Sequence, residues 1–136
     1  MTQAYYLPDS LAIPYDGVDA EHGRLIALLN AAWHIAETAS GNAQAVDGTL
    51  AALSEAMAAH FAHEEHEMEI LGYGELAQHK VHHLHCARKF AAIHKSINDC
   101  GPSKAVLDQI FDVLIEDIIC ADSGFKSFLY AKGILR

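Results

Sequence analysis

The chain is 136 residues long, which suits one domain with a core of its own, and its formal net charge is -9 at pH 7. This negative charge, without a cluster of Lys and Arg, argues against nucleic acid or an anionic membrane as a partner. The sequence shows neither an apolar run of about 18 residues nor a secretory signal, so we expect a single cytoplasmic domain over residues 1–136.

The cysteines, Cys86, Cys100 and Cys120, are odd in number and show no Cys-x-x-Cys spacing. Such a set suggests neither a disulfide framework nor a structural zinc site, and free thiols in a reducing compartment are expected. The 10 histidines are harder to explain, because they are dispersed along the chain and therefore do not form a tag.

Residues 1–18 are predicted to form an extended arm. Pro8, Pro14 and Gly17 disfavour a helix there. The aromatic and aliphatic residues between them suggest that the arm packs along the helices that follow.

The first predicted helix covers residues 19–39. Asp19 is a candidate N-cap, and apolar residues then repeat at helical spacing until a Ser-Gly-Asn sequence at 40–42 ends the run. His22 lies one turn inside the helix start, on the same face as the apolar residues.

The second predicted helix covers residues 43–71 and contains the motif His-Phe-Ala-His-Glu-Glu-His-Glu-Met, which begins at His60. His60 and Glu64 are four residues apart, so their side chains share one face, which is otherwise apolar. His63 and Glu67 form a second pair with the same spacing one face over. The register of the apolar residues in the motif favours His60 and Glu64.

The third predicted helix covers residues 75–98 and has the clearest period in the sequence. Its core stripe contains His79 and His83, again four residues apart. His82 and His85 lie beside this stripe. We therefore expect His79 and His83, and not their neighbours, to point into the interior.

The fourth predicted helix covers residues 102–130. Gly101 and Pro102 are expected to end the preceding helix and begin this one, because proline suits the first helical turn. The apolar stripe of this helix includes Asp117. One turn later the stripe continues through either Ala121 or Asp122.

Four amphipathic helices with short connections, and no alternating strand pattern, predict an all-α, antiparallel up-down four-helix bundle with an extended N-terminal arm. Cofactors of such bundles lie in the core between facing helices. A lone histidine on an apolar face is usually a core or boundary residue, but here several converge with carboxylates. Seven side chains are therefore candidate metal ligands: His22, His60, Glu64, His79, His83, Asp117 and Asp122.

The chemistry of these side chains supports metal binding. A buried carboxylate costs several kcal/mol unless it is paired or bound to metal, and the core stripes carry no Lys or Arg. Mixed imidazole and carboxylate ligands favour iron, zinc, manganese or copper over calcium and magnesium. Seven ligands exceed the needs of one tetrahedral zinc and suit two ions bridged by carboxylates. Neither Glu-x-x-His nor His-Glu-x-x-His is present, which disfavours the ferritin-like and the common zinc hydrolase sites.

These motifs resemble the hemerythrin family, in particular its single-domain bacterial members, over nearly the whole chain. Asp19–His22 matches the family's Asp-x-x-His, His60–Met68 its His-Phe-x-x-Glu-Glu-x-x-Met, and His79–His83 its His-x-x-x-His. The fourth motif, His-x-x-x-x-Asp, departs, because Asp117 stands in place of the family's histidine while Asp122 is retained.

The resemblance implies a non-haem di-iron centre, bridged by carboxylates, that reversibly binds O2 or another small diatomic ligand for storage, transfer or sensing. In the family no other substrate is transformed, so an enzymatic role is not the first expectation. Zinc or manganese is an alternative to iron at the position next to Asp117. The ligands carried over are His22 and His60 on one ion, His79, His83 and Asp117 on the other, and Glu64 and Asp122 between them.

Asp117 opens several alternatives. Its added negative charge is expected to favour ferric iron and to speed autoxidation. If its shorter side chain does not reach, that ion keeps a water or the site holds one ion. A carboxylate-rich site also resembles the sites of di-iron oxidases and peroxidases, so an O2-activating enzyme is the rival function. A metal-storage protein with altered metal content is a third possible function. We expect a monomer, because no exposed apolar stripe is evident.

Overall fold

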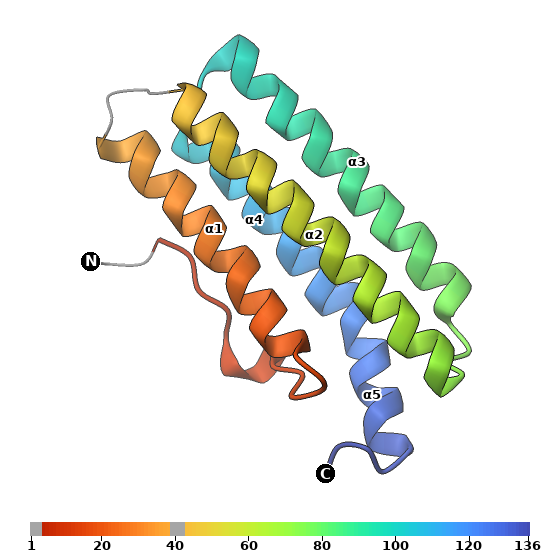
Figure 1. Cartoon of the computed structure of the whole chain (residues 1–136). Coiled ribbons are helices and arrows are strands. Elements are labelled where there is room, and N and C mark those ends of the chain that lie inside the picture. The colour runs from red at the N-terminus through yellow and green to blue at the C-terminus, as the bar shows by residue number, and fades with distance from the viewer. Residues whose placement is uncertain (1–3, 39–42) are drawn as a thin grey trace.

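The computed structural model describes residues 4–38 and 43–136, and within these ranges every regular element is helical (Figure 1). None of the helices in these ranges combines the length and apolar character needed to span a membrane. The elements are η1 (Asp9–Leu11, 3₁₀), α1 (Val18–Thr38), α2 (Ala43–Leu71), α3 (Leu76–Cys100), α4 (Lys104–Glu116), the π-helical η2 (Asp117–Asp122) and α5 (Ser123–Ala131).

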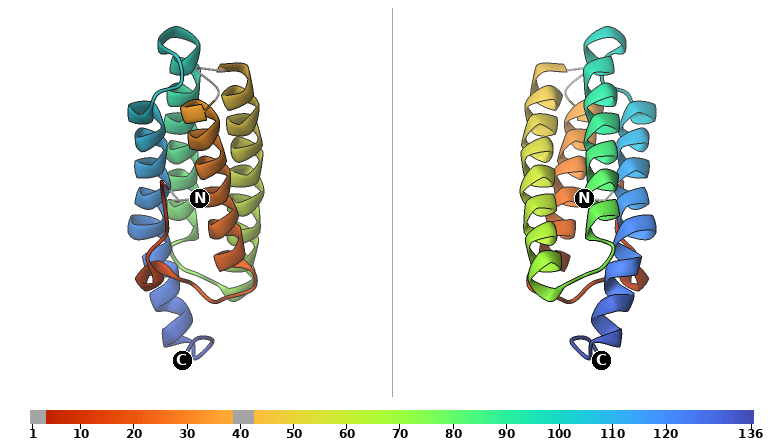
Figure 2. Two further views of the ribbon diagram at one scale, coloured as in Figure 1. Left: turned by 90° about the vertical axis from the view of Figure 1, so that its left-hand side faces the viewer. Right: turned by 90° about the vertical axis from the view of Figure 1, so that its right-hand side faces the viewer.

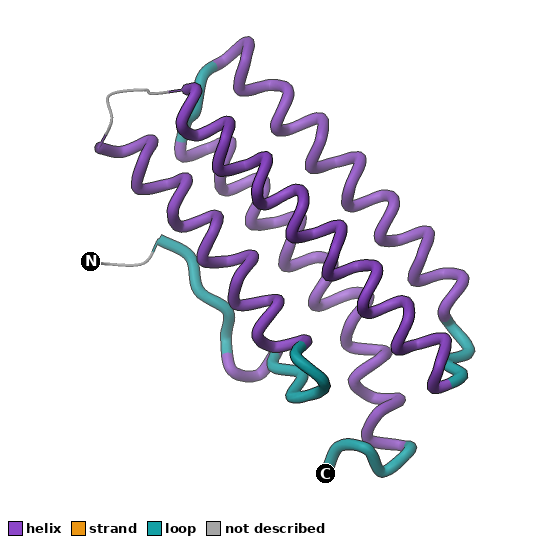
Figure 3. The backbone as a smooth tube through the Cα atoms, in the orientation of Figure 1, coloured by secondary structure: helices purple, strands orange, loops and turns teal. Residues whose placement is uncertain are grey.

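The long helices lie side by side and alternate in direction (Figures 1 and 2). α1 packs against α2, α2 against α3 and α3 against α4, and α4 returns to α1. Short loops join α2 to α3 and α3 to α4 at opposite ends of the bundle (Figure 3). This arrangement confirms the predicted all-α bundle, in which each helix buries one face against its neighbours.

The arm packs along the bundle, as expected, and hydrogen bonds fix it there. The backbone N–H of Tyr5 donates to Asn30 Oδ1 (2.9 Å), and its hydroxyl donates to Asp108 Oδ1 (2.6 Å). Asp19, predicted as the N-cap of the first helix, lies inside the first turn of α1 instead. Its carboxylate accepts the backbone N–H of Ile13 (2.5 Å), so this residue ties the arm to the helix.

The fourth predicted helix begins later than expected. The hydroxyl of Ser103 accepts the backbone N–H of Val106 (3.3 Å), which makes Ser103 the N-cap of α4. Pro102 therefore lies outside the helix, and the prediction that it forms the first turn is wrong. Serine offers the side-chain acceptor that proline lacks, and this cap sets the start.

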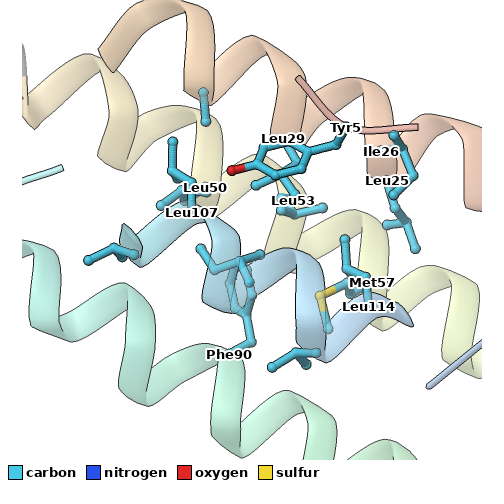
Figure 4. Close-up of a cluster of buried hydrophobic side chains, with 14 of the residues drawn as sticks. Tyr5, Leu25, Ile26, Leu29, Leu50, Leu53, Met57, Phe90, Leu107 and Leu114 are labelled. Carbon is cyan, nitrogen blue, oxygen red and sulfur yellow. The ribbon is translucent and has the colours of Figure 1, made fainter. Parts of the chain in front are cut away.

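Two apolar clusters fill the interior, and the candidate ligands lie between them. The larger cluster includes Leu25, Leu29 and Leu53 (Figure 4), and the smaller one includes Val18 and Met68. On α1, for example, the buried histidine at position 22 lies between Val18 of one cluster and Leu25 of the other. The polar residues thus form one layer with apolar packing on both sides, where low polarisability strengthens electrostatic interactions.

Candidate metal centre

All seven predicted ligands are buried, and none exposes more than 4% of its surface. Apart from Asn30, which binds the arm, they are the buried polar residues of the described ranges. Four segments of the chain therefore bring their interior polar groups to one layer. The residues are His22 from α1, His60 and Glu64 from α2, His79 and His83 from α3, and Asp117 and Asp122 from η2.

One group of four donors lies between α1, α2 and η2. His22, His60, Glu64 and Asp122 each offer an atom within 4.8 Å of the others. His22 Nε2 is 3.1 Å from His60 Nε2 and 3.0 Å from Asp122 Oδ2. His60 Nε2 is 3.5 Å from Glu64 Oε2. Two imidazole nitrogens and two carboxylate oxygens thus converge on one point.

A second group of four donors lies on the α3 side and uses the same two carboxylates. Glu64, His79, His83 and Asp122 again offer atoms within 4.8 Å of one another. Glu64 Oε1 is 2.7 Å from His79 Nε2 and 3.0 Å from His83 Nε2. Asp122 Oδ1 is 3.2 Å from His79 Nε2. Each carboxylate therefore turns one oxygen to each group, which is the arrangement of two ligands that bridge a pair of cations.

The centre leaves buried polar atoms without hydrogen-bond partners. Glu64 Oε2 and both carboxylate oxygens of Asp122 lack one, as does Nδ1 of His22. Each such atom costs about 1–3 kcal/mol, and more when it is charged. The ion pairs of these two carboxylates are with histidines. Cations between the imidazoles and carboxylates would satisfy the oxygens, so the residues fit metal ions.

The electrostatics reflect the close packing of acids and imidazoles. Burial raises the pKa of Asp122 to about 7, and burial together with the charge of Asp122 raises the pKa of Asp117 well above its usual value. Burial lowers the pKa of His79, but the adjacent carboxylates of Asp122 and Glu64 outweigh burial and raise the value to about 10. Burial alone would raise the pKa of Glu64, but hydrogen bonds from His79 and His83 outweigh burial, so the pKa of Glu64 is lowered. Protons therefore occupy part of the centre at neutral pH, and a cation must displace them.

Two acidic residues outside the centre orient the imidazoles. His60 Nδ1 lies 2.7 Å from Glu21 Oε1, and His83 Nδ1 lies 2.7 Å from Glu65 Oε2. When Nδ1–H is donated to a carboxylate, Nε2 keeps its lone pair for a metal. The sequence prediction missed both residues. Their only signal is position, since each directly adjoins a candidate ligand in the chain.

The alternative pair on α2 lies away from the buried layer. His63 is 26% exposed, and its Nε2 is 3.2 Å from Asp16 Oδ2 and 3.8 Å from Glu67 Oε1. Its Nδ1 shares Glu21 with the buried histidine of the preceding turn. The structure thus puts His63 and Glu67 in a half-exposed cluster near the arm. This agrees with the register of the apolar residues, which favours His60 and Glu64 as the interior pair.

The η2 segment explains how two aspartates five residues apart face one interior. In an α-helix, residues that far apart point about 140° away from each other. The wider π-helical turn, with its i to i+5 hydrogen bonds, aligns them instead. Asp117 and Asp122 are accordingly both buried, while Ala121 is half-buried. The prediction of an uninterrupted helix over 102–130 is therefore wrong at this segment.

Asp117 lies beside the two groups of donors but belongs to neither. Its Oδ1 is 3.6 Å from His83 Nε2 and 3.9 Å from His82 Nε2. The donors within 4.8 Å of it and of each other are those of His82 and Cys86. The hypothesis that Asp117 completes the second ion therefore stays a hypothesis.

A cavity of about 540 Å³ reaches the centre from the surface between α3 and α5. His79, His82 and His85 line one wall, and Tyr73 and Gly124 lie across from them. A side chain at Gly124 would narrow this space, because its Cβ would lie 2.8 Å from the Tyr73 hydroxyl. The cavity gives small molecules and hydrated ions a way to the α3 side of the centre.

A helical bundle with a core layer of imidazoles and carboxylates is the architecture of the metal-binding helix bundles. The family model described as the hemerythrin HHE cation-binding domain matches residues 13–119. The chain therefore belongs to the hemerythrin family, as its motifs suggested. Comparisons with curated proteins and with solved structures give no match. The family match ends before Asp122, so the place of that residue in the centre rests on its geometry.

Proposed function

We propose that the chain binds two iron ions between its helices and reversibly binds O2 there, for storage, transfer or sensing. The supporting observation is that Glu64 and Asp122 each turn one oxygen to the α1 side and the other to the α3 side. This is the donor set that two adjacent carboxylate-bridged ions require. Membership of the cation-binding hemerythrin family supports the same assignment.

A bound pair of iron ions would supply the electrons that O2 binding needs, and the residues of the chain would hold and shield the pair. His22 and His60 would hold one ion, and His79 and His83 the other. Among the described residues, the group on the side of His22 holds two imidazoles and the two shared carboxylates, whereas Asp117 lies 3.6 Å from His83 on the α3 side. The ion held by His22 and His60 would therefore have fewer protein ligands and an open position for O2. Apolar packing above and below the layer excludes water.

Reconstitution with Fe²⁺ under anaerobic conditions tests the proposal. Elemental analysis should give two irons per chain, and O2 should produce an absorption band that disappears when O2 is removed. His60→Ala should lose iron and the band, whereas the control His66→Ala, which changes an exposed histidine of the same helix, should keep both. A protein that binds zinc, or no metal, under these conditions would contradict the proposal.

An O2-activating oxidase or peroxidase is the second candidate. It is favoured by the cavity of about 540 Å³ at His79, which has room for an organic substrate, and by the additional carboxylate of Asp117. Rapid loss of the O2-dependent band, coupled to oxidation of an added reductant, would support this activity over reversible O2 binding.

A further inference from the structure

Three donors of different chemistry converge beside the two groups described above. His82 and Cys86 are four residues apart on α3 and share a helix face, and Asp117 comes from η2. One donor atom of each lies within 4.8 Å of the others, and His82 Nε2 is 3.9 Å from Asp117 Oδ1. Neither His82 nor Cys86 belongs to the groups of donors around Glu64 and Asp122.

Two donor atoms of this cluster are buried and lack a hydrogen bond. His82 Nε2 and Asp117 Oδ1 have no hydrogen bond, and Asp117 is only 3% exposed. Cys86 is 1% exposed. The nearby Lys89 does not neutralise Asp117, because its ammonium group pairs with Glu116 (3.0 Å). A buried carboxylate that faces an imidazole and a thiol is costly unless it is protonated or bound to a cation, so a metal ion at this point would replace a proton.

We propose that His82, Cys86 and Asp117 form a third cation site, separate from the pair of ions between the helices. Imidazole, thiolate and carboxylate together select zinc or another borderline transition metal and disfavour calcium and magnesium. In a tetrahedral zinc site, nitrogen and oxygen ligands with bonds of about 2.0 Å lie about 3.3 Å apart. A small side-chain movement would therefore shorten the observed 3.9 Å between His82 Nε2 and Asp117 Oδ1 to the distance that a bound zinc requires.

The cavity provides the entry path. His82 lies in its wall, and Glu75 and Gln78 add oxygen donors along the same space. A cation can thus approach from solvent and keep a water or an exogenous ligand in the fourth position, as zinc sites with three protein ligands do. Burial raises the pKa of Cys86 to about 12, so binding releases the thiol proton.

Titration of the metal-free protein with Co²⁺ tests the site, because thiolate coordination to Co²⁺ gives an intense near-ultraviolet charge-transfer band that imidazole and carboxylate do not. The wild type should bind three ions per chain and develop the band. Cys86→Ser should lose the band and one ion while keeping two. The other cysteines are the same in both proteins, so a band that persists in Cys86→Ser would overturn the proposal.

A second variant guards against damage to the core from replacing Cys86. His82→Ala should also lose the third ion, whereas the control His66→Ala, which changes an exposed histidine of α2 outside the cavity, should bind three. Equal Co²⁺ stoichiometry in His82→Ala and His66→Ala would refute the site. Failure of O2 binding leaves this result unaffected, because the readout is the thiolate band and not the oxygenated iron.

Discussion

Glu65 is expected to control metal binding on the α3 side, although it does not face the centre. Its carboxylate accepts the Nδ1–H of His83 at 2.7 Å, which directs Nε2 of that ring toward Glu64. Glu65→Gln keeps the length of the side chain and removes the charge. The imidazole of the variant becomes less basic and its tautomer less fixed, so the α3 ion should bind more weakly.

The size of the effect follows from the surroundings of the pair. Loss of an outer hydrogen-bond partner typically costs about 10–100-fold in metal affinity. The side chain of Glu65 is 25% exposed, so solvent screens part of its charge. The His83 ring is also held by stacking on Phe61, with centroids 3.9 Å apart and planes 12° apart. We therefore expect the lower end, about tenfold or about 1.4 kcal/mol.

Competition titration with Zn²⁺ and a chromophoric chelator measures this difference. Glu69→Gln is the matched control, because it removes the same charge from an exposed position of the same helix. One binding step should weaken in Glu65→Gln, and Glu69→Gln should match the wild type. Glu21→Gln should weaken the other step, since Glu21 holds His60. Equal affinities of Glu65→Gln and Glu69→Gln would refute the role of this carboxylate.

Three further predictions follow from the site. After iron loading, Asp117→His should slow the loss of the oxygenated spectrum. Asp117→Asn should slow it too if the negative charge of Asp117 causes autoxidation. A spectrum that decays as fast in both variants as in the wild type would refute this role of Asp117. Chemical denaturation should show the metal-free protein losing stability from about pH 7 to about pH 10. Folding raises the pKa of Asp122 to about 7 and of His79 to about 10, so in this range the folded state binds more protons than the unfolded state. Saturating Zn²⁺ should reverse this slope. Gly124→Ala should destabilise the fold by about 1 kcal/mol, because overpacking against Tyr73 exceeds the gain in helix propensity. Adding Tyr73→Phe to this variant should restore its stability. An unchanged denaturation midpoint in Gly124→Ala alone would contradict the contact.

The bundle was predictable because each helix carries one apolar stripe with few interruptions. Where a stripe does contain a polar residue, as at His22 or His60, the structure buries that residue in the layer between the two apolar clusters. Periodicity therefore located the polar layer without any knowledge of which helices are neighbours. It could not show which donors share a point, because that depends on the relative height and rotation of separate helices.

The residues that the sequence did not reveal act through contacts between helices. Glu21 reaches His60 across 39 positions of the chain, and the donors of His82 and Asp117 meet across α3 and η2. An α-helical period also cannot anticipate a π-helical segment, which is why the sequence left Ala121 and Asp122 as alternatives on one stripe. The backbone hydrogen-bond pattern decides between them.

The η2 segment links the two proposals. Asp122 supplies an oxygen to each group of the central pair, and Asp117, one π-helical turn earlier, supplies an oxygen to the cluster of His82. In a regular α-helix only one of these aspartates would face the layer, and the other would point toward a neighbouring helix or solvent. A π-helical turn is rare, and it occurs frequently at functional sites. Binding of the proposed cations at both aspartates would stabilise this turn, so we expect removal of the metals to loosen η2 before the rest of the bundle.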